Sequence, residues 1–237
     1  MKLTITLISF VVLLFASCRL SQFNPFNRVE EHPAPKYTAD NSRFAELGCF
    51  DSVDCLPADL KNIQFPVVSI YPLDDSFGGL DPRLPMAKAG IMSFDYETVI
   101  PAVYAQGCMG TYYVRYLVEV DGEIRMIDSA EGLKQLYAPI ESDEEALSYA
   151  VAVTGLTPLN DLDEHPEYKR YTRPLIESHS TFDGKQYTVN LFDDYLCGCG
   201  PHIVSSVIVT VLQDGSFSLS EALGAFSDPE TDGLCID

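Results

Sequence analysis

Two runs of alternating apolar and polar residues, joined by a two-residue turn, dominate the middle of the chain. The first run covers residues 111–120, the second covers 123–128, and Asp121-Gly122 lies between them. Asp-Gly is typical of a tight hairpin turn because the turn requires positive φ angles that these residues tolerate. The pattern therefore predicts a β-hairpin over 111–128.

Helical spacing follows the hairpin. Ser129 is a candidate N-cap for a short helix that Pro139 ends. Ser142 and Glu145 have the spacing of a capping box, and the apolar residues that follow them fall on one helical face. Gly155 suits the C-cap of this second helix. We interpret its apolar stripe as core packing.

Strand patterns return in the last third of the chain. Asp-Gly pairs or glycine-rich segments separate four strand-like runs, at residues 173–182, 185–192, 202–212 and 216–219. The run at 202–212 is almost entirely apolar or hydroxyl-bearing, which indicates a central strand. A single sheet with both helices on one face buries the apolar surfaces of sheet and helices together. The predicted fold class is α+β: an antiparallel β meander with two helices packed on one face, preceded by an irregular Pro-rich segment.

Residues 48–237 are predicted to form one globular domain. Its first part, 48–107, is rich in proline and glycine and is predicted to be largely irregular, with a loop over 74–85. Residues 65–71 suit an edge strand, because an edge tolerates Pro66. The hairpin, helices and meander then occupy 108–237.

The N-terminus has the pattern of an export signal. Lys2 precedes an apolar stretch over 3–15, and Ala16-Ser17-Cys18 follows. Such a stretch is too short for a stable membrane span but suits the core of a signal peptide. The segment resembles the lipobox of bacterial lipoproteins, with Phe15 where an aliphatic residue is usual. The alternatives are a simple secretory peptide or an uncleaved anchor helix.

The lipoprotein resemblance implies a location. Cleavage would remove the signal peptide, residues 1–17, and leave Cys18 acylated and inserted in the lipid bilayer of the cell envelope. We expect the outer membrane in a two-membraned bacterium and otherwise the outer face of the plasma membrane. Residues 18–47 are predicted to be a flexible tether, because they are polar and contain Pro25, Pro33 and Pro35. The alternative is an ordered arm packed on the domain.

Composition narrows the classes of partner. The 237 residues contain 15 Lys and Arg against 35 Asp and Glu, a net charge of −20. A nucleic-acid partner is excluded by this charge, because the phosphate backbone would be repelled. A basic patch that adheres to anionic lipid is excluded for the same reason.

The cysteine count indicates an oxidising compartment. Seven cysteines are present, and assigning Cys18 to lipid leaves six disulfide candidates: Cys49, Cys55, Cys108, Cys197, Cys199 and Cys235. Cys49 and Cys55 enclose a short loop, so we predict that they pair with each other. The pairing of the other four stays open at this point, although a bridge from Cys235 would hold the C-terminal tail.

The densest group of reactive side chains is Cys197-Gly198-Cys199-Gly200-Pro201-His202. We favour a glycine-containing turn whose cysteines bridge to Cys108 and Cys235. In a first alternative Cys197, Cys199 and His202 bind a soft metal such as copper or zinc. In a second alternative the two thiols form a redox pair.

Function is much less constrained than location. The element order resembles that of secreted PepSY-like and cystatin-like modules. The stretch that runs from 136–141 through 197–202 resembles segments of uncharacterised bacterial exported proteins. Neither resemblance assigns a role to a residue, and the pattern identifies no catalytic residue. We favour a non-enzymatic binding or structural module of the envelope, without a cofactor, whose partner is an envelope protein or polymer. A metal-binding or thiol-redox lipoprotein is the alternative.

Overall fold

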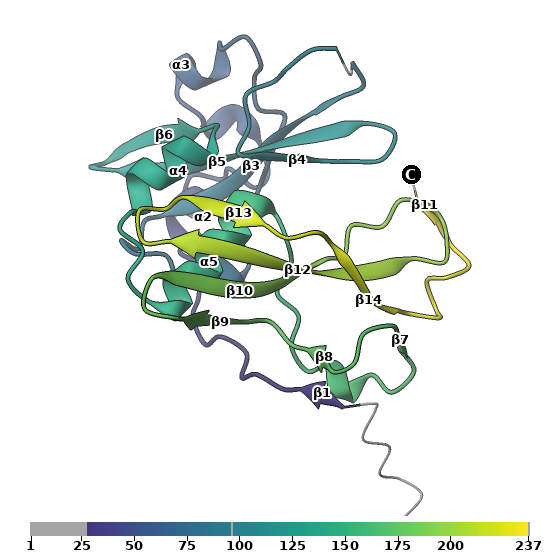
Figure 1. Ribbon diagram of the computed structural model, residues 1–237. Helices are drawn as coiled ribbons and strands as arrows, with labels where there is room; N and C mark the ends of the chain where they lie inside the picture. The colour runs from purple at the N-terminus through teal and green to yellow at the C-terminus, as the bar shows by residue number, and fades with distance from the viewer. Residues whose placement is uncertain (1–27, 96, 237) are drawn as a thin grey trace, which may run out of the picture.

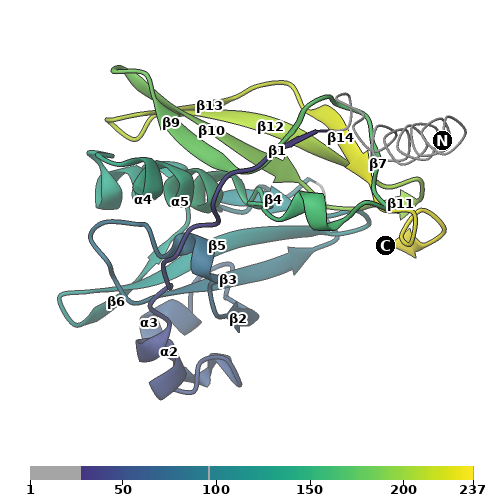
Figure 2. The ribbon, with the colours of Figure 1, turned by 90° about the horizontal axis from the view of Figure 1, so that it is seen from below.

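The computed structural model of the protein describes residues 28–95 and 97–236. Cys18 and the predicted signal peptide therefore lie outside the described residues. Two antiparallel sheets face each other, and two helices lie between them, as Figure 2 shows. The predicted α+β class, with a meander and two helices on one of its faces, is confirmed.

The first sheet is built from the middle of the chain and has the strand order β2-β3-β5-β4, with β6 also paired to β5. Its strands are β2 (Ser69–Tyr71), β3 (Met86–Ser93), β4 (Tyr104–Gln106), β5 (Thr111–Val120) and β6 (Glu123–Ile127). Short helices cover its outer side in Figure 2: α2 (Ser42–Glu46) and α3 (Ala58–Lys61). The 3₁₀ turns η2 (Val53–Cys55) and η3 (Asp75–Phe77) lie in the flanking loops.

The second sheet is the predicted meander and has the order β7-β14-β12-β10-β9, with β13 also paired to β12 (Figure 1). Its strands are β7 (Lys169–Arg170), β9 (His179–Phe182), β10 (Gln186–Asp193), β12 (Ile203–Leu212), β13 (Phe217–Leu219) and β14 (Leu223–Ser227). The predicted central strand is confirmed, because β12 lies between β10 and β14. A 3₁₀ turn, η4 (Leu162–Glu164), precedes β7.

Two short strand pairs hold the ends of the described chain. In the first, β1 (Val29–Glu30) runs parallel to β8 (Leu175–Ile176). In the second, β11 (Gly198–Cys199) runs antiparallel to β15 (Cys235–Ile236). The predicted strand over 173–182 is therefore divided into β8 and β9.

The predicted hairpin and both helix starts are confirmed. Asp121 and Gly122 have φ angles of 54° and 82°, so both central residues of the turn lie in the left-handed region. The helix α4 (Ala130–Tyr137) begins at Ser129, whose hydroxyl accepts a hydrogen bond from the Gly132 amide. The helix α5 (Asp143–Thr154) begins at Ser142, whose hydroxyl accepts one from the Glu145 amide.

The helix α5 is buried on every side. All nine residues from Glu145 to Val153 are buried, whereas the sequence pattern predicted one apolar face against a single sheet. The prediction of a single sheet is wrong: a second sheet covers the other side of α5. Two buried hydroxyls attach the helix to both sheets. Tyr116 of β5 donates a hydrogen bond to the Ala152 carbonyl (2.9 Å), and Tyr149 donates one to the Gly215 carbonyl (2.8 Å).

The strand β5 has a hydrophobic core on each face. Val114 and Tyr116 face α5, whereas Leu117 belongs to a second core with Phe44 and Cys49. Arg115 lies on the second face and is 2% exposed. Its guanidinium donates hydrogen bonds to two loop carbonyls, those of Phe65 (2.7 Å) and Pro101 (2.8 Å). These bonds satisfy a buried cation and attach both loops to the sheet.

The segment predicted to be irregular holds more structure than expected. The predicted edge strand is confirmed, because β2 pairs with β3 at one end of the strand order. The strands β3 and β4 correct the prediction for the rest of 48–107. All eight residues of β3 pair with β5. The sequence gives no local signal for β3, because the small residues Ala87, Ala89 and Gly90 interrupt the usual β-branched and aromatic pattern.

The predicted flexible tether over 18–47 is wrong for its described part. Residues 28–41 form an arm that lies against the domain, and Phe44 in α2 is fully buried. The arm begins with the pairing of β1 with β8. It ends where the Asp40 carbonyl accepts a hydrogen bond from the Met86 amide (2.9 Å), so the arm runs from the β1–β8 pair to the first sheet. For residues 28–47 the structure shows the ordered alternative.

A buried carboxylate explains why this polar arm is ordered. Glu177 is 2% exposed, and its two oxygens accept hydrogen bonds from the His32 amide (2.9 Å) and the Leu162 amide (2.8 Å). The His32 ring stacks on the His179 ring at a centroid distance of 3.7 Å. Contacts between residues so far apart in sequence leave no trace in local composition.

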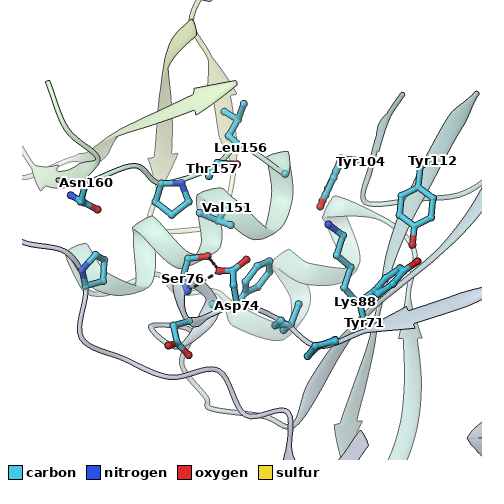
Figure 3. Close-up of a pocket in the computed structure, with 17 residues that line it drawn as sticks. Tyr71, Asp74, Ser76, Lys88, Tyr104, Tyr112, Val151, Leu156, Thr157 and Asn160 are labelled. Atoms are coloured by element: carbon cyan, nitrogen blue, oxygen red, sulfur yellow. Dashed lines mark hydrogen bonds between the residues drawn. The ribbon is translucent and has the colours of Figure 1, made fainter. Parts of the chain in front are cut away.

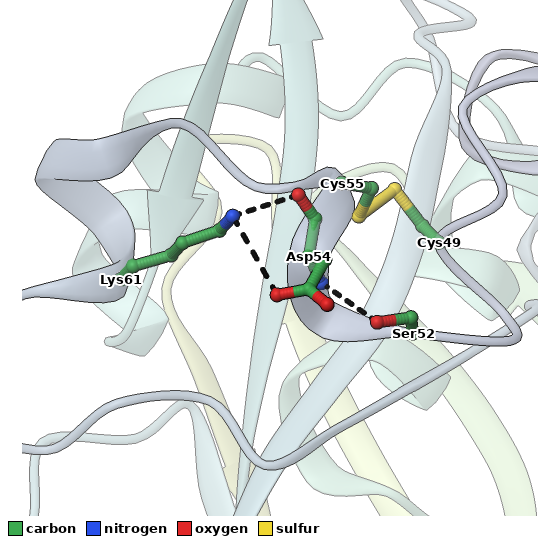
Figure 4. Close-up of a disulfide and its surroundings, with 5 residues drawn as sticks. All are labelled: Cys49, Ser52, Asp54, Cys55 and Lys61. Atoms are coloured by element: carbon green, nitrogen blue, oxygen red, sulfur yellow. Dashed lines mark hydrogen bonds and ion pairs between the residues drawn. A yellow bond between two sulfur atoms is a disulfide. The ribbon is translucent and has the colours of Figure 1, made fainter.

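Three disulfides account for the six described cysteines. The predicted Cys49–Cys55 pair is confirmed, and Figure 4 shows it beside Lys61, which donates a hydrogen bond to the Asp54 carbonyl (2.7 Å). The other pairs are Cys108–Cys197 and Cys199–Cys235. Cys108–Cys197 links the β4–β5 connection of the first sheet to the β10–β12 connection of the second. Among the described residues, no helix is long and apolar enough to cross a membrane.

The disulfide between the sheets is expected to contribute more stability than the local one. Cys108 and Cys197 are 89 residues apart, whereas Cys49 and Cys55 are 6 apart. Loop-closure entropy then predicts a loss of about 4.5 kcal/mol for the Cys108→Ser/Cys197→Ser variant and about 2 kcal/mol for Cys49→Ser/Cys55→Ser. Urea unfolding of both variants measures the free energies. Equal losses would contradict the entropic argument.

Candidate functional site

A groove opens between the first sheet and the C-terminal end of α5 with the loop that follows it, and Asp193 of β10 is the one residue of the second sheet in its lining. It consists of a cavity of about 610 Å³ and a neighbouring cavity of about 400 Å³, which share Lys88, Gly155, Leu156 and Thr157. The larger cavity falls in the range typical of small-molecule sites, ~300–1,000 Å³. We call the two cavities together the interlayer groove. Its lining includes the side chains of Tyr71, Asp74, Lys88, Tyr104, Tyr112 and Asp194.

Lys88 is the cation of the groove. It comes from β3, where it is the only charged residue in a run of small and apolar ones, and its side chain is half-buried. Within the described part of the chain, its ammonium makes no hydrogen bond and no ion pair within 4.0 Å. Burial lowers the pKa of Lys88, and the Asp74 carboxylate partly opposes this effect. A half-buried cation without a partner costs stability, so it is a candidate for binding a ligand.

Two glycines position two tyrosine rings of the groove. A Cβ at Gly155 would overlap the Tyr104 ring, and a Cβ at Gly90 would overlap the Tyr112 ring. Gly155 also has a φ of 72° as the C-cap of α5, so it serves the helix end and the tyrosine together. The rings therefore lie against backbone, which fixes their orientation.

The tyrosine hydroxyls differ in their surroundings. Tyr112 shares a hydrogen bond of 3.0 Å with the Ser69 hydroxyl, and burial raises the pKa of Tyr112. Burial raises the pKa of Tyr104 to about 12. Tyr71 on the edge strand β2 is 51% exposed. In Figure 3 the Lys88 side chain lies between Tyr104 and Tyr71.

Carboxylates flank Lys88 on both sides of the groove. Asp74 caps η3, because its carboxylate accepts hydrogen bonds from the Ser76 amide and hydroxyl. In the smaller cavity, Asp194 accepts a hydrogen bond from the Thr157 hydroxyl (2.8 Å). The charged residues of the lining are Asp74, Asp75, Asp193, Asp194 and Lys88. The C-terminal end of α5 adds a partial negative charge, so the groove is acidic overall with one central cation.

The sequence-predicted cysteine segment does not form a metal site in the structure. Cys197 and Cys199 are each bonded to a distant cysteine, which confirms the disulfide-turn interpretation and leaves neither thiolate for a metal. His202 is buried, and its ring contacts the Leu234 carbonyl (3.1 Å). Over residues 28–95 and 97–236, no group of three or more His, Cys, Asp or Glu side chains has metal-binding geometry. Cys18 lies outside the described residues.

The sequence pattern does not predict the interlayer groove. Lys88 and Tyr104 lie in the segment predicted to be irregular, and only the pairing of β3 and β4 with β5 brings them to Tyr112. One signal was present in the sequence. Lys88 is the single charged residue within the apolar run 86–92. If this run forms a buried strand, the ammonium needs either a partner in the fold or a ligand.

Comparison with protein-family models, with curated proteins and with solved structures finds no match to this chain. The functional interpretation therefore depends on the geometry of the groove and on the sequence pattern.

An alanine substitution at Gly155 is expected to cost more stability than one at Gly184, a glycine that also has a positive φ. Gly155→Ala requires a positive φ and also overlaps Tyr104, whereas Gly184→Ala requires a positive φ of 94° with no atom within 4 Å. We expect Gly184→Ala to cost about 1 kcal/mol and Gly155→Ala about 1–3 kcal/mol more. Urea unfolding measures both. Equal losses would show that Tyr104 does not pack on Gly155.

Lys88→Met is expected to stabilise the protein at neutral pH. The lowered pKa means that the folded state binds the Lys88 proton less well than the unfolded state, whose pKa is near 10.5. The charged form therefore destabilises folding at neutral pH, and this cost falls as pH rises through the folded pKa toward 10.5. The gain in melting temperature should be largest near pH 7 and shrink toward pH 10.

The control for this measurement is Lys185→Met, since Lys185 is exposed in a turn. We expect it to leave the melting temperature nearly unchanged at pH 7. A Lys88→Met variant that melts below the wild type at pH 7 would show that Lys88 is held by a favourable interaction in the fold.

Proposed function

We propose that the protein is an exported, lipid-anchored module of the bacterial cell envelope that binds a ligand in the interlayer groove without catalysing a reaction. The observation that carries this proposal is a cavity of about 610 Å³ lined by the Tyr104 and Tyr112 rings and by Lys88, whose ammonium has no partner among the described residues. Such a concave site with a few convergent polar groups is the usual form of a ligand site.

Two features support an exported location. Three disulfides link parts of the chain, and disulfides form and persist in oxidising compartments outside the cytosol. The lipobox-like segment before Cys18 supports acylation, and several acyl chains on one residue would hold the protein firmly in a bilayer. The chain itself, with a net charge of −20, gives no electrostatic attraction to an anionic membrane.

Binding is favoured over catalysis by the surroundings of Lys88. A lysine nucleophile needs a lowered pKa, which burial gives Lys88, and also a general acid or base within hydrogen-bond reach. Within the described residues the Lys88 ammonium has no such partner, and the raised pKa of Tyr104 makes its hydroxyl a poor base at neutral pH. The groups in the groove can donate hydrogen bonds to a bound molecule and accept hydrogen bonds from it.

The lipid anchor is tested by the mass of the full-length protein extracted from membranes. We expect the purified chain to begin at Cys18 and to carry the added mass of acyl chains, and Cys18→Ser to lack that mass and to leave the membrane fraction. A wild-type chain that keeps residues 1–17 and carries no added mass would overturn the anchor.

Groove binding is tested with the same detergent-extracted protein and purified peptidoglycan sacculi, an envelope polymer. We expect the wild type to co-sediment with the sacculi and the Lys88→Met/Tyr71→Ala variant to remain in the supernatant. Tyr171→Ala removes an exposed tyrosine that follows β7 and lies outside the groove, so it is the matched control and should sediment like the wild type. Equal sedimentation of all three proteins would overturn the groove as the binding site.

A further inference from the structure

We infer that the interlayer groove takes a neutral saccharide chain, and this inference rests on the proposed binding function. It follows from the combination of the Tyr71, Tyr104 and Tyr112 rings, an ammonium without a partner among the described residues, and flanking carboxylates in one open groove. Each of the three kinds of group matches a different part of a sugar ring.

The tyrosine rings match the apolar faces of sugars. A pyranose ring exposes C–H groups on its faces, and these pack against the electron-rich face of an aromatic ring. Tyr104 and Tyr112 are held against Gly155 and Gly90, so little side-chain entropy is lost when a ligand packs on them. Tyr71, which is 51% exposed, extends this aromatic lining toward the solvent-exposed edge of the groove.

The polar groups match the hydroxyls of sugars. A sugar hydroxyl both donates and accepts hydrogen bonds, so it needs acceptors and donors close together. The exposed carboxylates of Asp74 and Asp194 are acceptors, and the ammonium of Lys88 supplies three donors that no described residue uses. A polyol would satisfy this ammonium without requiring a fixed counter-charge.

The distribution of charge argues against charged polymers. A polyanion would meet the carboxylates of Asp74, Asp75, Asp193 and Asp194 and the negative end of α5. A polycation would be attracted by these carboxylates but would meet Lys88, which belongs to both cavities and so lies where they join. Neither kind of chain finds one sign of charge along the groove, whereas a neutral chain pays no such penalty.

The test is calorimetric titration of the full-length, detergent-extracted protein. The neutral probes are chitotetraose, cellotetraose and maltotetraose, the anionic probe is tetragalacturonate, and the cationic probe is tetralysine. We expect one of the neutral probes to bind with one site per chain and more tightly than either charged probe. Tyr71→Ala and Lys88→Met should each weaken this binding about tenfold or more, and Tyr171→Ala should leave it unchanged.

Two results would overturn the inference. The first is that none of the three neutral probes binds, and the second is that tetragalacturonate or tetralysine binds more tightly than all of them. Unfolding curves of each variant establish that a loss of affinity occurs in folded protein, and Tyr71 is exposed enough that its removal should not affect folding.

The failure of this inference is distinguishable from failure of the proposed function. Protein that co-sediments with sacculi through the groove but ignores the neutral oligosaccharides would keep the binding function and assign another part of the polymer as the ligand. Protein that binds neither would overturn both.

Discussion

The burial of α5 between two sheets is the constraint on which the rest of the structure depends. Because α5 has a sheet on each side, residues 146–153 carry no charge, and the buried hydrogen bonds from the helix to the sheets join hydroxyls to carbonyls. The helix also keeps the sheets apart by about its own diameter, ~10 Å. Where it ends at Gly155, the space between the first sheet and the loop that follows the helix becomes the interlayer groove.

Local signals gave the correct elements wherever a few neighbouring residues determine the backbone. The Asp121-Gly122 turn, the caps at Ser129 and Ser142 and the cap at Gly155 are all of this kind. Pairing between segments that are distant in the sequence could not be predicted from neighbouring residues. The strand β3 depends on β5, and the order of the arm depends on Glu177, so neither shows a periodic pattern of its own.

The groove was hidden for the same reason. Gly155 was recognisable as a helix cap, but its second role, leaving space for the Tyr104 ring, depends on a strand that the pattern did not predict. Lys88 shows how a binding site conflicts with stability. Its burial is unfavourable for the fold, and departures from the rules of core packing concentrate at sites that a protein uses. A single charged residue within an otherwise apolar strand pattern therefore indicates a candidate binding site.

The covalent link between the sheets has a practical consequence for anyone who produces this protein. Cys108 is next to Gly107 and Cys197 is two residues from Tyr195, so the bond joins the two walls of the groove at one end. Material made in a reducing host cytosol would lack this bond. Its two walls would then be free to separate, and a ligand screen on such material would sample a wider, less defined opening than the oxidised protein offers.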